Sequence, residues 1–398
     1  MLGRLTTILC GLALVAVLMI AIAWATSSDP KKNPASFEAE PIVVGVARAD
    51  QAITLAQFKT TAGETATILV LDYDSGRVSG IDLFKLGAPR LEDPFAVLEA
   101  VTRDSLRNAA VDDVARIVVP VEQLLPAGPG GARHIGIGTN FPEHAEESSS
   151  DSVFNFPKFG AATPARTIVQ VEPGVLLDYE VELCMRFDRD VSSLADFDAA
   201  TKGVFLCSDF TNRTALVELV DPDNLDSGYG FSDAKSGLGF FPTGPFLVIP
   251  QDWAAFVSDV RMTTELNGEP RQDARGGEMI LDFRQLTEKV LADMAEPRFF
   301  YRDEFYRLAR DGRIAADMAL MSGTSEGVIF TPPVRHDYIE ALLTYLITGG
   351  PLAGRDLMEV AIQVFINNEL ASGHFLQGGD EVTYRSSALG DIVVSVVD

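Results

Sequence analysis

Short apolar runs alternate with polar positions along most of the chain after Arg133. Val, Ile, Leu and Phe recur at every second position, and Gly, Pro and Asn separate the runs, a pattern typical of strands joined by turns. Asn267-Gly268 stands between two such runs and predicts a tight hairpin. The runs expected to form strands are ARTIVQVE, LDYEVELCMRF, GVFLCSDF, GPFLVIP, VRMTTELNG, ADMALMSGT and the final DIVVSVVD.

Residues 41–130 combine strand-like runs (PIVVGVA, TATILVLDY and VARIVVPV) with a helical stretch near Pro94–Ala109. The sequence PAGPGG at 126–131 then interrupts the pattern and marks a boundary. We therefore expect a small α+β domain at 41–130, followed by a β-rich domain at 131–398.

Residues 337–373 replace the β pattern with two stretches of helical spacing. Each begins at an aspartate of the kind that caps helices, Asp337 or Asp356, and ends at glycine. We expect two helices inserted into the β-rich domain, with apolar faces that serve packing or a subunit contact rather than a lid. The fold class is therefore predicted as α+β, mainly β.

The N-terminus differs from the rest of the chain. Ile8–Ala25 is an uncharged apolar run of 18 residues, a length between that of a signal peptide and that of a membrane span. Ala23-Trp24-Ala25 fits a cleavage site, and the polar residues 26–40 resemble a linker. We expect residues 1–25 to be either a signal peptide or a membrane anchor, with residues 8–25 in the membrane in the second case. The protein would then be exported or membrane-anchored, on the periplasmic side in a Gram-negative bacterium.

Composition excludes some partners. A formal net charge of −25 argues against nucleic acid and anionic lipid, because both require clustered Lys and Arg. A local basic pocket can still bind a small anion. Cys10 lies in the N-terminal apolar run, and Cys184 and Cys207 are expected to be small core residues. In an oxidising compartment these two could form one bridge if their strands are neighbours.

The stretch DYEVEL at 178–183 places two carboxylates two residues apart on a predicted strand. Glu180 and Glu182 would point to one side with Cα atoms about 7 Å apart, so their charges need solvent, basic partners or a cation. A solvated edge face satisfies that need without a cation. Asp209 ends another apolar run and adds a third acid. Three carboxylates without a His or Cys cluster suit Mg²⁺ or Mn²⁺, with Ca²⁺ as a third candidate.

Further candidate groups lie in loops and a short helix. His144 and Glu147 are three residues apart in GIGTNFPEHAEE, so on a helix the glutamate could orient the histidine as a general base. Such pairs are common on helices, and the other three histidines, without such a partner, are expected to be structural or exposed. Three cations stand beside Gly, Pro or small residues, as loops near a site often do, although each could be a surface charge: Lys158, Arg213 and Lys235. The loop SGTSEG at 322–327 offers N–H groups and the Thr324 hydroxyl to an anion.

Taken in order, these segments resemble the fumarylacetoacetate hydrolase family. The likeness extends from about Gly136 to Val397 and rests on eight ordered matches rather than on one motif. The matching segments are Gly138-TNFPEHAEE, Phe156-Pro-Lys158, DYEVEL at 178–183, Asp209-FTNR, Lys235-SGLGFFPTGP, Asn267-GEPRQ, Gly323-TSEGV and Gly379-Asp380. The leader and the insertion at 337–373 depart from the family pattern.

The resemblance implies a mixed β-roll that holds a divalent metal through Glu180, Glu182 and Asp209, together with water. It implies a homodimer that hydrolyses a C–C bond in a 2,4-dioxo acid, such as an acylpyruvate or a fumarylacetoacetate-like compound, through a metal-stabilised enolate. The substrate would be a small anionic 2-oxo acid.

The expected catalytic residues are His144, oriented by Glu147 to deprotonate water, and Lys235. Lys235 would also position the anionic end of the substrate, with Arg213 and Thr324, and Lys158 would lie near the mouth of the site. The same site would serve a 2-oxo acid decarboxylase, isomerase or hydratase. An exported binding protein that keeps the fold and metal without catalysis is the alternative from another class.

Overall fold

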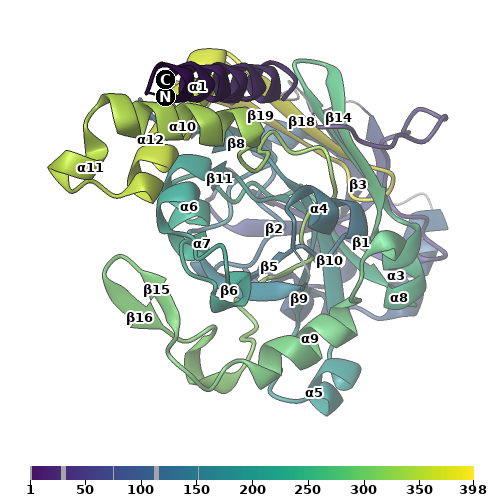
Figure 1. Ribbon diagram of the computed structural model, residues 1–398. Coiled ribbons are helices and arrows are strands. Elements are labelled where there is room, and N and C mark those ends of the chain that lie inside the picture. The colour runs from purple at the N-terminus through teal and green to yellow at the C-terminus, as the bar shows by residue number, and fades with distance from the viewer. Residues whose placement is uncertain (1, 28–32, 75, 112–115, 151) are drawn as a thin grey trace. The chain divides into compact units, whose positions relative to one another are not determined.

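The computed structural model describes residues 2–27, 33–74, 76–111, 116–150 and 152–398 (Figure 1). Its contacts divide the chain into two compact units. The first, here called the helical unit, comprises Met1–Asn33 and Phe330–Phe375. The second, here called the β unit, comprises Pro34–Ile329 and Leu376–Asp398. The predicted class, α+β and mainly β, is confirmed.

Two sheets build most of the β unit. The larger has ten strands in the order β4-β3-β2-β1-β12-β10-β9-β17-β5-β6, with bounds Ile117–Pro120, Arg77–Asp82, Thr65–Asp74, Ala52–Lys59, Leu247–Pro250, Lys202–Ser208, Val181–Phe187, Leu320–Met321, Arg133–Gly138 and Phe154–Phe159. The smaller has five in the order β14-β13-β18-β19-β7, with bounds Glu269–Arg275, Arg261–Leu266, Glu381–Ser386, Asp391–Val397 and Arg166–Gln170. Strands far apart in the chain thus become neighbours, as β13 and β18 do.

Short helices and two small two-stranded sheets complete the β unit. The pairs are β8 with β11, Leu177–Asp178 and Thr211–Asn212, and β15 with β16, Phe299–Tyr301 and Glu304–Tyr306. The helices α2 to α9 are Pro94–Glu99, Arg103–Val111, Pro142–Glu147, Leu194–Ala199, Arg213–Leu219, Phe231–Lys235, Trp253–Asp259 and Phe283–Ala292. The helical stretch expected near residues 94–109 is therefore two helices rather than one.

The first four strands do not form a compact unit of their own. β1 pairs antiparallel with β12, so that β1–β4 extend the same sheet as the strands after residue 131. The structure thus divides the chain differently from the predicted boundary at 130/131. PAGPGG is a connection within the β unit rather than a linker between units.

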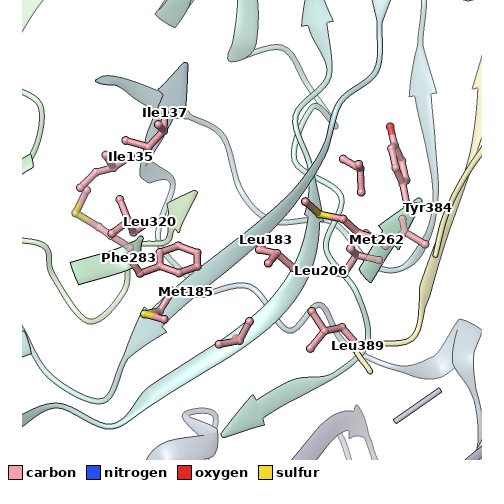
Figure 2. Close-up of a cluster of buried hydrophobic side chains, with 14 of the residues drawn as sticks. Ile135, Ile137, Leu183, Met185, Leu206, Met262, Phe283, Leu320, Tyr384 and Leu389 are labelled. Carbon is pink, nitrogen blue, oxygen red and sulfur yellow. The ribbon is translucent and has the colours of Figure 1, made fainter. Parts of the chain in front are cut away.

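The strands β9 and β10 are buried along their whole length because both faces are covered. On one face, Leu183 and Met185 of β9 belong to the same cluster as Met262 of β13 and Tyr384 of β18 (Figure 2). On the other face, residues of β9 and β10 join a second cluster that includes Phe95 of α2. The centre of the sheet is therefore shielded from solvent on both faces.

The two central strands are also cross-linked. Cys184 of β9 and Cys207 of β10 form a disulfide with Cα atoms 5.9 Å apart, and both residues are fully buried. The sequence suggested core residues, with a bridge if the strands were neighbours. The structure shows the neighbouring strands, the core position and the bridge together.

The predicted hairpin at Asn267-Gly268 is confirmed between β13 and β14. Asn267 has φ 53° and Gly268 has φ 78°, so both turn residues adopt the left-handed conformation. Asn and Gly tolerate that conformation better than other residues, which explains the strength of this sequence signal.

The helical unit contains α1 (Leu2–Ala25), α10 (Arg335–Ile347), α11 (Gly350–Ala353) and α12 (Leu357–Ser372). The predicted pair of inserted helices is confirmed, with one short helix between them. Asp356 caps α12 by accepting the Met358 N–H, as expected. Asp337 does not begin α10, because the helix starts two residues earlier. The Asp337 side chain instead accepts the Val334 N–H from inside the first turn.

Searched over the residues that the structure describes, the chain has no helix with the length and hydropathy required to cross a bilayer. That finding gives no support to the span expected at residues 8–25.

Candidate functional site

The DYEVEL stretch does not lie on one continuous strand as predicted. β8 ends at Asp178 and β9 begins at Val181, so Glu180 falls in a break between them. The break is held by side chains: Asp178 Oδ1 accepts the N–H of Ile329, and Gln272 Oε1 accepts the N–H of Val181. These polar contacts replace the strand pairing that an uninterrupted β-strand would have made.

Three carboxylates meet where β9 begins and β10 ends. Oxygen atoms of Glu180, Glu182 and Asp209 lie within 4.8 Å of one another, and all three residues are buried. The antiparallel register places Ser208 opposite Val181, and the Asp209 N–H then donates to Glu180 O at 3.0 Å. Strand pairing therefore brings the predicted acids together from segments almost thirty residues apart.

Two lysines enter the same cluster. Lys235 Nζ lies 2.6 Å from Glu180 Oε2 and 2.9 Å from Asp209 Oδ2. Lys158 Nζ donates to Asp209 Oδ1 and to the backbone oxygen of Lys235. Lys158 is fully buried, so the expectation that it lies near the mouth of the site is wrong. Its ammonium group holds Asp209 in place from within the core.

Arg213 is held by two carboxylates rather than standing free. Its Nε donates to Asp178 Oδ2 at 2.8 Å, and its Nη2 donates to Glu180 Oε1 at 2.7 Å. Asp178 was not assigned a role from the sequence, although it is the first letter of the motif that carries the two glutamates. The contacts explain its position: it anchors Arg213, and Arg213 in turn fixes Glu180.

The buried charges do not balance within the cluster. Four carboxylates, Asp178, Glu180, Glu182 and Asp209, face three cations, Lys158, Arg213 and Lys235. Glu182 is the acid left over: among the described residues it has no ion-pair partner, its Oε2 accepts the Gly323 N–H at 2.9 Å, and its buried Oε1 has no hydrogen-bond partner. A hard divalent cation bound by the three oxygen donors would supply that partner, so the residues present fit such an ion.

The two glutamates of the motif differ in their acidity. Burial raises the pKa of Glu182 well above its usual range, and the nearby charges of Asp209 and Glu180 raise it further. Burial also opposes ionisation of Glu180, but Lys235 and Arg213 outweigh it and lower the pKa of Glu180 to about 2. Metal binding would therefore use one carboxylate that is already ionised and one that must lose a proton.

The predicted His144–Glu147 pair is present on α4. His144 Nδ1 lies 2.7 Å from Glu147 Oε2, and the Gly327 N–H donates to Glu147 Oε1 at 3.2 Å. Because a carboxylate accepts, Nδ1 carries the hydrogen in the neutral imidazole, and Nε2 is the acceptor, which the Ser148 hydroxyl approaches at 3.4 Å. Burial raises the pKa of Glu147, and the bond to His144 opposes that rise. A charged His144 would lower the pKa of Glu180, so the pair lies close enough to influence the triad.

The 322–327 loop serves the protein's own acids. Its Gly323 and Gly327 N–H groups go to Glu182 and Glu147, rather than being left for an external anion as the sequence suggested. The Thr324 hydroxyl donates to Val181 O and accepts from Gln272 Nε2, both at 2.9 Å. Gln272 lies in the segment Asn267-GEPRQ, and the sequence assigned it no role. The structure shows that its side chain bonds both to Val181 at the break before β9 and to Thr324 of this loop.

Comparisons with known proteins agree with the geometry. Residues 133–397 match the family model described as fumarylacetoacetate (FAA) hydrolase, C-terminal. Two solved structures each cover 87% of this chain and 98% of their own, with a TM-score of 0.51: a 5-carboxymethyl-2-hydroxymuconate delta-isomerase from Mycobacterium smegmatis at 18% identity, and a 2-hydroxyhepta-2,4-diene-1,7-dioate isomerase from Mycobacterium marinum at 17%. At these identities they show a shared fold.

Curated relatives are uncharacterized. One from Staphylococcus epidermidis is 29% identical over 163 residues, which cover 39% of this chain and 51% of the relative. Another from Pyrococcus abyssi is 27% identical over 168 residues, covering 40% and 71% respectively. The match thus spans about half the length of the first curated relative.

Proposed function

The chain belongs to the fumarylacetoacetate hydrolase family, and from this premise we propose that it is a divalent-metal-dependent enzyme that hydrolyses a C–C bond of a 2,4-dioxo acid. The observation that carries the proposal is the buried triad Glu180, Glu182 and Asp209, in which Glu182 has no ion-pair partner among the described residues. A binding site for an organic anion alone would not be expected to contain a buried carboxylate that lacks a cation partner.

Mg²⁺ or Mn²⁺ held by the triad would supply the positive charge that favours enolate formation in a 2-oxo acid. His144 would take a proton from water through Nε2, while Glu147 holds the Nδ1–H and stabilises the imidazolium that forms. The hydroxide oxygen bonds to C4 of the substrate, and the C3–C4 bond breaks with its electron pair going to C3. The proton that His144 took would then return to C3, which gives a carboxylic acid and a 2-oxo acid.

Lys235 contacts two of the three acids, Glu180 and Asp209, so a ligand bound at the triad would lie beside it. Burial lowers the pKa of Lys235, but Asp209 and Glu180 outweigh it and raise the pKa above its ordinary value, so the ammonium stays charged. We assign it to the anionic oxygens of the substrate. Arg213 and Lys158 we assign to holding Glu180 and Asp209 in place, since each donates to one of these acids. Lys235 donates to Glu180 as well, so its contact with the substrate would be in addition to that role.

An isomerase is the second candidate, because two proteins that share the fold are named as isomerases of unsaturated diacids. Proton transfer between carbons needs the same enolate and the same histidine, without addition of water. Product mass separates the two reactions, since hydrolysis adds water and splits the chain and isomerisation does neither.

The test is a panel of acylpyruvates, oxaloacetate and 2-hydroxydienoate diacids, assayed with Mg²⁺, with Mn²⁺ and with a chelator, with products identified by mass. We expect metal-dependent cleavage of an acylpyruvate, loss of bound metal and turnover in Asp209→Ala, and normal behaviour in the exposed control Asp223→Asn. Full activity with chelator, or in Asp209→Ala, would refute the metal mechanism. A parent chain that binds these acids without turning any of them over would be a binding protein.

A further inference from the structure

The helical unit exposes apolar side chains on two segments that are remote in sequence. In the described part of α1 the consecutive residues Val17, Leu18, Met19 and Ile20 are all exposed. At 3.6 residues per turn, four consecutive positions cover about 300° of the helix circumference. A helix that is apolar on every side is typical of a protein core or of lipid surroundings, since a single protein partner covers only one face.

The inserted helices add a second apolar surface within the same unit. On α10, Tyr338, Leu342 and Leu346 are exposed and lie four residues apart, so they form one stripe along the helix. Leu343 and Ile347 extend the stripe, and the Ile347 side chain is 82% exposed. The opposite side of α10 is where Ala341 is buried. Leu352 of α11, 95% exposed, continues the apolar surface past the end of the stripe.

The helices α1 and α10 are in contact within the helical unit, where Trp24 Nε1 donates to Glu340 Oε1 at 2.9 Å. Trp24 is itself exposed at the C-terminal end of α1. An indole that offers an apolar ring while its N–H is satisfied is suited to the boundary between hydrocarbon and water.

The charge of the helical unit differs sharply from that of the rest. It contains five Lys and Arg and six Asp and Glu, a formal charge of −1, out of −25 for the whole chain. The acidic character that argues against anionic lipid therefore resides in the β unit. A nearly neutral, apolar surface matches the interface of an uncharged zwitterionic bilayer, to which neither attraction nor repulsion of charge would contribute.

We propose that the helical unit docks on a lipid bilayer, with the apolar stripe of α10 and the tip at α11 entering the interface beside α1. The occupant is lipid rather than a second copy of the chain because α1 is apolar around its circumference. This inference is independent of the reaction proposed above. It gives the insertion a function in placing the enzyme at a membrane surface.

The test is co-sedimentation of the full chain with phosphatidylcholine vesicles. We expect the parent chain to sediment with them to an extent that does not depend on salt. The triple variant Leu342→Glu, Leu346→Glu and Ile347→Glu should bind at least tenfold more weakly, because three exposed apolar residues that would enter the interface become charged. The matched control is Leu238→Glu in the β unit, where the side chain is 95% exposed; it should bind like the parent.

Other outcomes overturn the proposal. If Leu14→Glu with Leu18→Glu abolishes binding and the α10 variant does not weaken it, α1 alone contacts lipid and the insertion has no part. A parent chain that ignores phosphatidylcholine vesicles refutes the docking outright. If the α10 variant turns a dimer into a monomer in sedimentation velocity without changing vesicle binding, the stripe is an interface between copies. Unchanged circular dichroism and thermal midpoint show that the variants fold.

Discussion

Replacing Glu182 with glutamine separates the effect of a bound cation from that of the fold. Glutamine keeps the side-chain length and an oxygen that can accept the Gly323 N–H, but it removes the negative charge. Burial, with the charges of Asp209 and Glu180, raises the pKa of Glu182, so at pH 8 its ionisation opposes folding. Each unit of such a shift corresponds to about 1.4 kcal/mol. We therefore expect the metal-free variant to be at least as stable as the metal-free parent.

Metal should reverse that order. A ligand that binds only the folded state stabilises it by about 2.7 kcal/mol at a concentration one hundred times its Kd. The parent should gain an amount of this size from Mn²⁺ or Mg²⁺. The variant should gain little at the same concentration, because it has lost one of the three carboxylates that lie within 4.8 Å of one another.

The assay is urea unfolding at pH 8 of both proteins, first with chelator and then with a series of metal concentrations. Glu143→Gln, at an exposed position on α4, is the matched control and should respond to metal like the parent. Two results would refute the reasoning. One is equal stabilisation of parent and Glu182→Gln by metal. The other is a metal-free variant that is clearly less stable than the metal-free parent, which would mean that the Glu182 charge is already balanced by the protein.

Three further predictions concern the surroundings of the site. Removing the disulfide as Cys184→Ala with Cys207→Ala should lower the free energy of unfolding by about 3 kcal/mol in urea titrations, since the bridge closes a loop across 23 positions; an unchanged midpoint under non-reducing conditions would contradict this. Burial lowers the pKa of His134 to about 3. As the pH falls below about 6.5, His134 therefore binds a proton in the unfolded chain but stays neutral in the folded chain. Stability should fall by about 1.4 kcal/mol between pH 7.5 and 5.5 through this residue, and His134→Gln should lack that component of the slope. Thr324→Val should lower the free energy of unfolding in urea by about 1–3 kcal/mol, because the Val181 carbonyl and the Gln272 amide lose their hydrogen-bond partner. Thr324→Ser, which keeps the hydroxyl, should retain most of that stability.

The proximity of the three acids could be predicted because it depends on local rules. Glu180 and Glu182 are fixed two positions apart in the sequence, and Asp209 follows a second apolar run that pairs with the first. The ordered motifs of the family resemblance supplied the expectation that the three acids hold a metal. The break at Glu180 was not predictable in this way, because it depends on Gln272 reaching across from a distant hairpin to bond the Val181 N–H.

The roles of the cations were harder to predict than their presence. A basic residue beside glycine or proline has the same sequence signature whether it faces substrate or supports an acid. Lys158 was expected at the mouth and lies fully buried against Asp209, and Arg213 is held between Asp178 and Glu180. Burial and long-range pairing decide such cases. For the same reason the pairing of β1 with β12, which joins the N-terminal strands to the central sheet, had no signal in either segment alone.

The position of the triad at the end of two buried strands explains why an unpaired charge there is costly. Glu182 lies opposite Cys207 in the register, and the apolar cluster around the disulfide begins directly beside it. With little water on that side, removing one partner of a buried ion pair costs about 3–5 kcal/mol. Neutralising Lys158 or Arg213 should therefore unfold the chain more readily than neutralising Glu182, although all three residues are buried and ionisable. Glu182 is the group whose charge the protein's own cations leave unbalanced, and that imbalance is the one that a divalent ion would correct.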